Sequence, residues 1–217
     1  MVNTNLELNI NTLKKYTINM IDKCDEALNA SIDCMVRKDL EGAKLVIEKD
    51  DEIDLLREYI RDRSIELLAL KQPMARDLRY VYALGSIAIE LERIGDYAVN
   101  ICQETLKIGE QPYIKSLIDI PKMAKECSEM LNQAKKALQE ADEKLAYDAA
   151  LRDEVVDKLY EQIHVDCLEI MNKTEGTVNQ GVRLLFVGRY LERVGDHITN
   201  ICEKVIYAIN GEMMEIG

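Results

Sequence analysis

Residues 91–102 read LERIGDYAVNIC and residues 191–202 read LERVGDHITNIC, so one twelve-residue segment recurs 100 positions later with eight identical residues. A fainter match lies upstream of this segment. There, Asp50-x-x-x-Asp54 corresponds to Asp153-x-x-x-Asp157, 103 positions later, and the different offset requires only a small gap in a connecting loop. Self-similarity at this distance indicates that the chain contains one structural unit twice.

The residues around the repeat have the spacing of amphipathic helices. Apolar residues return every three or four positions along nearly the whole chain. The 217 residues include only 10 Gly and 3 Pro, too few for the many turns of a β-sandwich or barrel. We therefore predict an all-α protein of six long helices, arranged as two tandem, pseudo-symmetric three-helix bundles. The first bundle would comprise residues 1–110 and the second residues 111–217.

A few interruptions of the apolar pattern set the expected helix boundaries. Asp39 is a candidate N-cap for the second helix, and Pro73 suits the first turn of the third helix, where its missing N–H costs nothing. The glycines at 109, 176 and 211 are expected to follow helix ends. The six predicted helices cover about residues 9–36, 40–71, 73–108, 120–141, 142–175 and 177–210.

Charge and composition exclude several classes of protein. The net charge of −12 argues against binding to nucleic acid, whose phosphates attract basic surfaces. The longest uncharged stretch, residues 80–89, is shorter than the roughly 18–20 apolar residues that cross a membrane. The first fifteen residues have no secretory-signal pattern, so we expect the mature chain to start at Met1 and to be cytoplasmic. The six cysteines form no C-x-x-C pair and are expected to be reduced thiols in the core.

Carboxylate pairs recur at equivalent places in the two units. Residues four apart in a helix lie one turn apart, so their oxygens can converge on a cation. Among 40 acidic residues, about seven such pairs are expected by chance, so one pair alone would ordinarily be a solvated surface. Four pairs in matching positions instead favour metal binding. The pairs are Asp50 and Asp54, Glu92 and Asp96, Asp153 and Asp157, and Glu192 and Asp196.

Helical geometry predicts where these pairs lie. Glu92 and Asp96 fall opposite the apolar stripe that contains Leu91, whereas Asp50 and Asp54 lie on the flank of their own stripe. The two pairs of one unit can therefore face each other near the surface. Carboxylates held this close raise one another's pKa unless a cation neutralises them.

Other kinds of site fit the sequence less well. A ferritin-like di-metal site needs two Glu-x-x-His motifs, and only Glu161-x-x-His164 occurs. The second histidine, His197, would at most supplement a site. We expect Arg93 and Arg193, which follow the motif glutamates, to orient carboxylates. The sequence contains no phosphate-binding glycine loop or nucleophile elbow, so we expect no enzyme.

The two motif copies, together with residues 72–96 and 184–207, resemble the PhoU family of phosphate-transport regulatory proteins over essentially the full length. The resemblance implies a cytoplasmic, non-enzymatic adaptor that restrains phosphate uptake and represses the phosphate-starvation response. Its implied partners are the ATPase subunit of a phosphate ABC transporter, a phosphate-sensing histidine kinase and a second copy in a homodimer. Contact with the membrane would occur only through these partners.

The resemblance also implies a metal site on the bundle surface. Its ions would be Fe, Zn, Mn or Mg, and carboxylates alone favour the harder cations among them. The implied ligands are Asp50, Asp54, Glu92, Asp96, Asp153, Asp157, Glu192 and Asp196, with Asn100 and Asn200 as additional candidate oxygen donors. Three alternatives remain open at this point: a metal-sequestering helical bundle, an accessory protein of a low-affinity phosphate permease, and a purely structural interaction protein.

Overall fold

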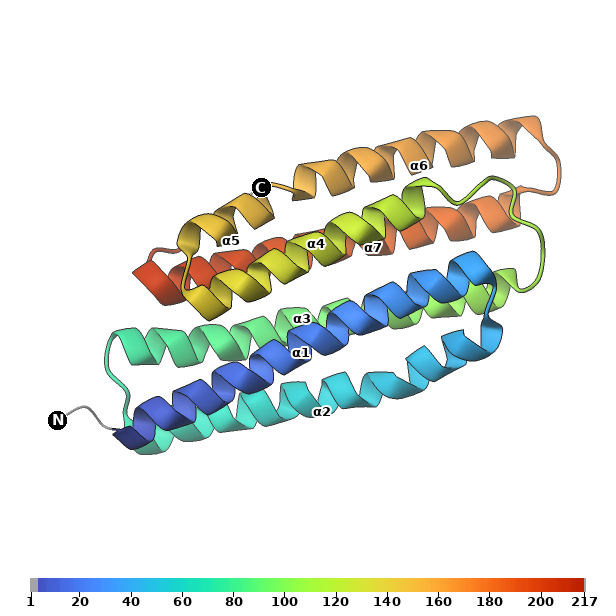
Figure 1. Ribbon diagram of the computed structural model, residues 1–217. Coiled ribbons are helices and arrows are strands. Elements are labelled where there is room, and N and C mark those ends of the chain that lie inside the picture. The colour runs from blue at the N-terminus through green and yellow to red at the C-terminus, as the bar shows by residue number, and fades with distance from the viewer. Residues whose placement is uncertain (1–3, 217) are drawn as a thin grey trace.

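The chain forms two elongated bundles of α-helices that lie side by side (Figure 1). This computed structural model describes residues 4–216; residues 1–3 and 217, which belong to the predicted repeats 1–110 and 111–217, lie outside the described part. The predicted all-α class with tandem bundles is confirmed. The helices are α1 (Thr4–Arg37), α2 (Leu40–Lys71), α3 (Arg76–Ile108), α4 (Asp119–Glu140), α5 (Glu143–Ala150), α6 (Asp153–Lys173) and α7 (Val178–Asn210).

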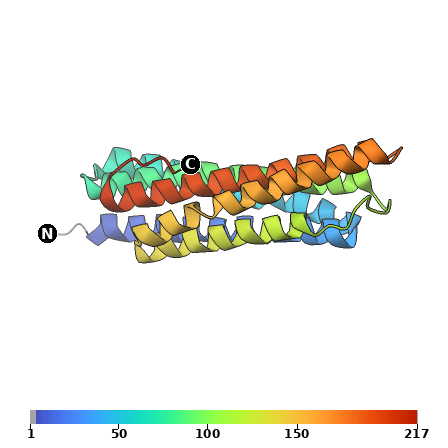
Figure 2. The ribbon, with the colours of Figure 1, turned by 90° about the horizontal axis from the view of Figure 1, so that it is seen from above.

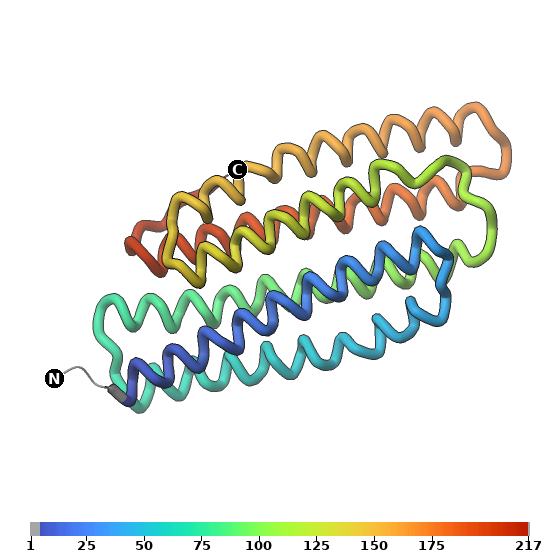
Figure 3. The backbone as a smooth tube through the Cα atoms, in the orientation of Figure 1, coloured from blue at the N-terminus to red at the C-terminus, as the bar shows by residue number. Residues whose placement is uncertain are grey.

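The two bundles contact each other through two pairs of helices. The first bundle contains α1–α3 and the second α4–α7, with α3 packed against α7 and α1 against α4. Seen from above, α1 and α4 share one layer while α3 and α7 lie in the other (Figure 2). Residues 109–118 cross from one bundle to the other at one end of the molecule (Figure 3). The helices that carry the repeated motif therefore lie at the centre.

Local sequence signals explain several helix ends. Asp39 accepts a hydrogen bond from the backbone N–H of Gly42 at 2.8 Å, which confirms it as the N-cap of α2. Asp142 caps α5 in the same way through the N–H of Leu145 at 3.0 Å. Gly109 and Gly211 follow α3 and α7 with φ of 64° and 85°, a backbone region that favours glycine.

Three boundaries differ from the prediction. The first is that α1 begins at Thr4 and not near residue 9. The single helix expected over residues 142–175 is divided into α5 and α6 at Leu151 and Arg152. Arg152 pairs there with Glu126 at 2.7 Å and with Glu129, both on α4, and the break lets the alanines of α5 pack into the second bundle. Pro73 is not in the first turn of α3, which begins at Arg76. It is buried in the preceding connection, where the chain changes direction.

The predicted apolar stripes form the core. Leu91, Ile94 and Ile101 of α3 are fully buried, and so are Leu191, Val194 and Ile201 of α7. The six cysteines are buried and free, as predicted. Within residues 4–216, no helix combines the length and the apolar character needed to cross a bilayer.

Candidate metal centre

The carboxylates of the first repeat gather between α2 and α3. We call Asp50 and Asp54 of α2 with Glu92 and Asp96 of α3 cluster 1. Burial raises the pKa of Asp50 to about 6, and the negative charges of Asp54, Asp96 and Glu92 add to this effect. The two pairs therefore lie on facing helices, near enough for the charge of each of the other three carboxylates to act on Asp50.

The second repeat builds the same arrangement between α6 and α7. Cluster 2 contains Asp153 and Asp157 of α6 with Glu192 and Asp196 of α7. Burial raises the pKa of Asp153 to about 7, and the negative charges of Asp157, Asp196 and Glu192 add to this effect. Burial and the Asp196 charge also raise the pKa of Asp157 and of Glu192. Four like charges here resist full ionisation unless a cation joins them.

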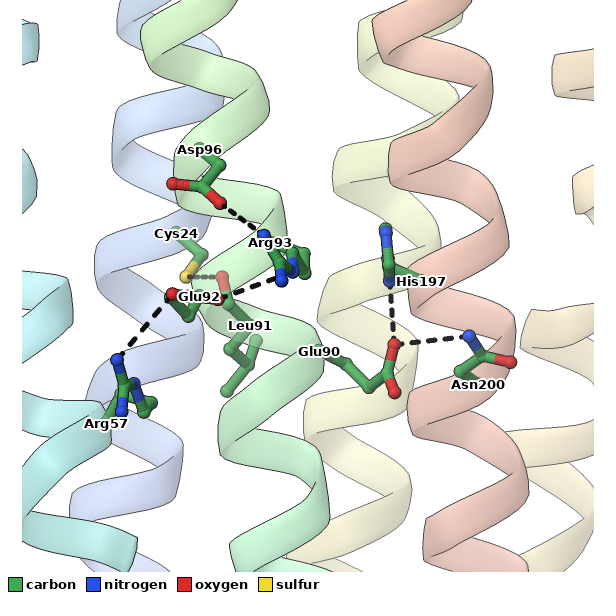
Figure 4. Close-up of polar contacts among 9 residues, drawn as sticks. All are labelled: Cys24, Arg57, Glu90, Leu91, Glu92, Arg93, Asp96, His197 and Asn200. Carbon is green, nitrogen blue, oxygen red and sulfur yellow. Dashed lines mark hydrogen bonds and ion pairs between the residues drawn. The ribbon is translucent and has the colours of Figure 1, made fainter.

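Arginines take part in both clusters. Arg93 lies 3.2 Å from Asp96 in cluster 1, and Arg193 lies 2.8 Å from Asp196 in cluster 2, so both arginines contact the carboxylates that they were expected to orient. Arg57 of α2 reaches Glu92 from the opposite helix at 3.8 Å (Figure 4). In cluster 2 the additional arginine is Arg189, which pairs with Glu192 from within α7.

The donors of both clusters are carboxylates, the kind of ligand that a hard cation takes. In the arrangement described for residues 4–216, no three His, Cys, Asp or Glu side chains converge closely enough to hold a metal ion. Glu92, Asp96 and their counterparts pair with arginines instead. Asp153 Oδ1 and Glu192 Oε2 are nevertheless buried without a hydrogen-bond partner in this part of the chain. Buried carboxylate oxygens in that state are costly. Carboxylate oxygens are the ligands that hard cations prefer.

A cysteine thiol contacts the backbone next to each cluster. Cys24 Sγ donates to the carbonyl of Leu91 at 3.2 Å, and Cys127 Sγ donates to the carbonyl of Leu191 at 3.4 Å. These contacts link α1 to α3 and α4 to α7 immediately before the motif glutamates. A cavity of about 290 Å³ lies between α1 and α2, and Asp50 is the member of cluster 1 that lines it.

The additional candidate donors lie differently. Asn200 donates to Glu90 Oε2 at 3.2 Å, between α3 and α7 (Figure 4). His197 Nδ1 contacts the same oxygen at 2.7 Å. These hydrogen bonds outweigh the effect of burial and lower the pKa of Glu90. The structure therefore assigns Asn200 and His197 to the contact between bundles, and Asn100 lies half-buried on α3.

Sequence reasoning did not single out Gly95 and Gly195. Both are buried in helix interiors, where they pack against Asp50 and Asp153. A signal for them was present, because a glycine repeated inside a helical motif marks a close approach of another group. Arg57 and Arg189 carried no such signal, since they occupy non-equivalent positions in the two repeats.

Comparison with known proteins shows which family both repeats match. The family model described as PhoU domain matches residues 17–105 and 120–205. The phosphate-specific transport system accessory protein PhoU homolog of Clostridium acetobutylicum is 32% identical over 212 residues, or 97% of each chain. The protein of the same name from Aquifex aeolicus is 33% identical, and the match covers 93% of this chain and 91% of that protein.

Solved structures share the whole architecture. The phosphate transport system regulatory protein PhoU from Streptococcus pneumoniae superposes with a TM-score of 0.91 at 27% identity, over 97% of this chain and 100% of that one. PhoU from Pseudomonas aeruginosa gives a TM-score of 0.91 at 26% identity, over 95% and 99% of the two chains. Because the PhoU domain matches most of the sequence and the relatives align over nearly their full length, this chain belongs to the PhoU family.

Proposed function

We propose that this chain is an accessory and regulatory protein of a phosphate transport system. The observation that carries the proposal is the match of both repeats, over nearly the whole chain, to proteins named for that role. The two-bundle fold offers long helical surfaces, which suit a protein that acts by binding partners. A non-enzymatic mechanism is part of the proposal.

The finer role that we propose is that of a cytoplasmic adaptor. It would contact the ATPase subunit of a phosphate ABC transporter and a phosphate-sensing histidine kinase, as a homodimer, and restrain uptake when phosphate is plentiful. The long, acidic surface of the paired bundles supports this role because it offers a large area for basic partner surfaces, consistent with the net charge of −12.

Clusters 1 and 2 are proposed to hold hard metal cations. A bound cation would neutralise the facing carboxylates and join α2 to α3 and α6 to α7. This part is supported by one buried oxygen each of Asp153 and Glu192 that accepts no hydrogen bond within residues 4–216, and by the raised pKa values of Asp50 and Asp153. The cation would thus stiffen the surface of each bundle at which partners are recognised.

The proposed function is tested in the organism that carries the gene. Deletion of the gene should raise the uptake of radiolabelled phosphate in phosphate-rich medium, and the intact gene should restore it. The purified chain should also retain the transporter's ATPase subunit in a binding assay. Unchanged uptake in the deletion strain, measured beside a strain lacking the transporter as control, would contradict the proposal.

A further inference from the structure

Two glycines occupy helical positions whose backbone conformation any residue could adopt. Gly95 and Gly195 are buried in the interiors of α3 and α7. The glycines with positive φ in residues 4–216 are Gly109, Gly176 and Gly211, so Gly95 and Gly195 have ordinary helical backbone. A glycine in such a position costs roughly 0.5–1 kcal/mol relative to alanine. The absence of a side chain must therefore be what these positions require.

The missing side chain leaves room for an aspartate from the neighbouring helix. A Cβ atom on Gly95 would lie 2.9 Å from Asp50 Oδ1, and a Cβ atom on Gly195 would lie closer still to Asp153 Oδ1. Real Cβ atoms do not approach other atoms this closely. Apolar neighbours are less tightly placed, since Ile53 and Val156 come within 3.1 Å and 3.3 Å of the same positions.

The same contact occurs in both repeats although the surroundings differ. Position 57 beside cluster 1 is an arginine, and the corresponding position 160 beside cluster 2 is a tyrosine. The pairing of glycine with aspartate is retained despite this change. Gly42 also lies against a carboxylate, but that of Asp39, which caps its own helix. A Cβ atom on Gly85 would lie 3.3 Å from the hydroxyl of Ser64.

We propose that Gly95 and Gly195 are positioning residues that let the carboxylates of Asp50 and Asp153 lie against the backbone of α3 and α7, among the other carboxylates of their clusters. A side chain at either position would push the aspartate out of the cluster and weaken cation binding there. This inference rests on the cation-binding role proposed above. It adds to that role two residues that do not themselves touch the cation.

The test uses the full-length chain and Mn²⁺ as the probe. Mn²⁺ binding is measured by isothermal titration calorimetry on wild type, Gly95→Ala and Gly195→Ala, with Gly85→Ala as the matched control. Each cluster is isolated by replacing the acids of the other with amides. We expect each alanine to weaken binding at its own cluster at least tenfold, whereas Gly85→Ala changes it less than twofold.

Thermal melting in a chelator separates positioning from simple folding damage. Alanine is the better helix former, so Gly95→Ala should melt within a few degrees of wild type once Asp50 has moved. In the Asp50→Asn background, Gly95→Ala should cause no further loss of Mn²⁺ affinity. If Gly195→Ala fails to fold, Gly195→Ala with Asp153→Ala should fold again, because the obstructing carboxylate is gone.

The outcomes distinguish this inference from the proposed function. Wild-type Mn²⁺ binding that persists unchanged in both glycine variants would overturn the positioning role alone. An equal loss in Gly85→Ala would also overturn it, since the effect would then belong to any helix glycine. Absence of Mn²⁺ binding by the wild type would overturn both this inference and the cation-binding part of the proposed function.

Discussion

At the scale of single residues, the raised pKa values of Asp50 and Asp153 make the metal-free protein sensitive to pH. Their folded-state values are about 6 and about 7, well above the ordinary 3.8 of an aspartate. The folded state therefore binds these protons more tightly than the unfolded state. The stabilisation of the folded state by these two protons is fully present below pH of about 4 and is lost as the pH rises through 7.

We therefore predict that the wild type in a chelator melts at a higher temperature at pH 5 than at pH 8. The variant with Asp50→Asn and Asp153→Asn should lose most of this difference, because the amides do not titrate. Thermal melting at both pH values measures it. A difference of the same size in the variant would show that other groups cause the pH dependence.

Arg57 supplies a second prediction at the residue scale. Its guanidinium lies 3.8 Å from Glu92, so it places a positive charge beside cluster 1. Tyr160 stands at the corresponding position beside cluster 2. Replacement Arg57→Tyr should strengthen Mn²⁺ binding at cluster 1 by about three- to tenfold, as expected for loss of a nearby like charge worth about 1 kcal/mol. Calorimetry on a variant whose cluster 2 acids are replaced by amides measures the Mn²⁺ affinity of cluster 1. Unchanged or weaker Mn²⁺ binding would contradict the prediction.

At the scale of elements, side-chain caps fix where α2 and α5 begin. Asp39 and Asp142 each accept a hydrogen bond from a backbone N–H in the first turn. Asp39→Ala and Asp142→Ala should each lower the free energy of unfolding by about 1 kcal/mol, because that N–H loses its partner. Urea unfolding measures the change. Glu58→Ala, at an exposed position within α2, serves as control and should change stability by less than about 0.5 kcal/mol.

The elements also show what sequence alone can predict. Helical spacing predicted the buried stripe around Leu91 and, from it, the meeting of Asp50 with Glu92, because both depend on rotation about one helix axis. The break before Asp153 was missed, since Leu151 and Arg152 are not helix breakers. That break coincides with the pairing of Arg152 with carboxylates on α4, a tertiary contact. The approach of Arg57 to Glu92 likewise depends on how two helices pack.

At the scale of the whole molecule, buried polar contacts hold the bundles together. Glu104 of α3 is only 4% exposed and pairs with Arg183 of α7 at 3.0 Å and with Lys107 at 2.6 Å. Glu104→Ala should lower the free energy of unfolding by about 2–4 kcal/mol, because it leaves Arg183 half-buried without its carboxylate. Urea unfolding tests this. A loss no larger than that of Glu154→Ala, which removes an exposed pair, would contradict it.

The proposed metal binding involves both bundles at once, with cations held by facing carboxylates on α2–α3 and α6–α7. Elemental analysis of protein purified without chelator tests it most directly. The comparison is a variant in which Glu92, Asp96, Glu192 and Asp196 are replaced by alanine, with melting curves of both proteins. We predict bound metal in the wild type and its loss in a variant that remains folded. Equally low metal in both proteins would contradict the claim.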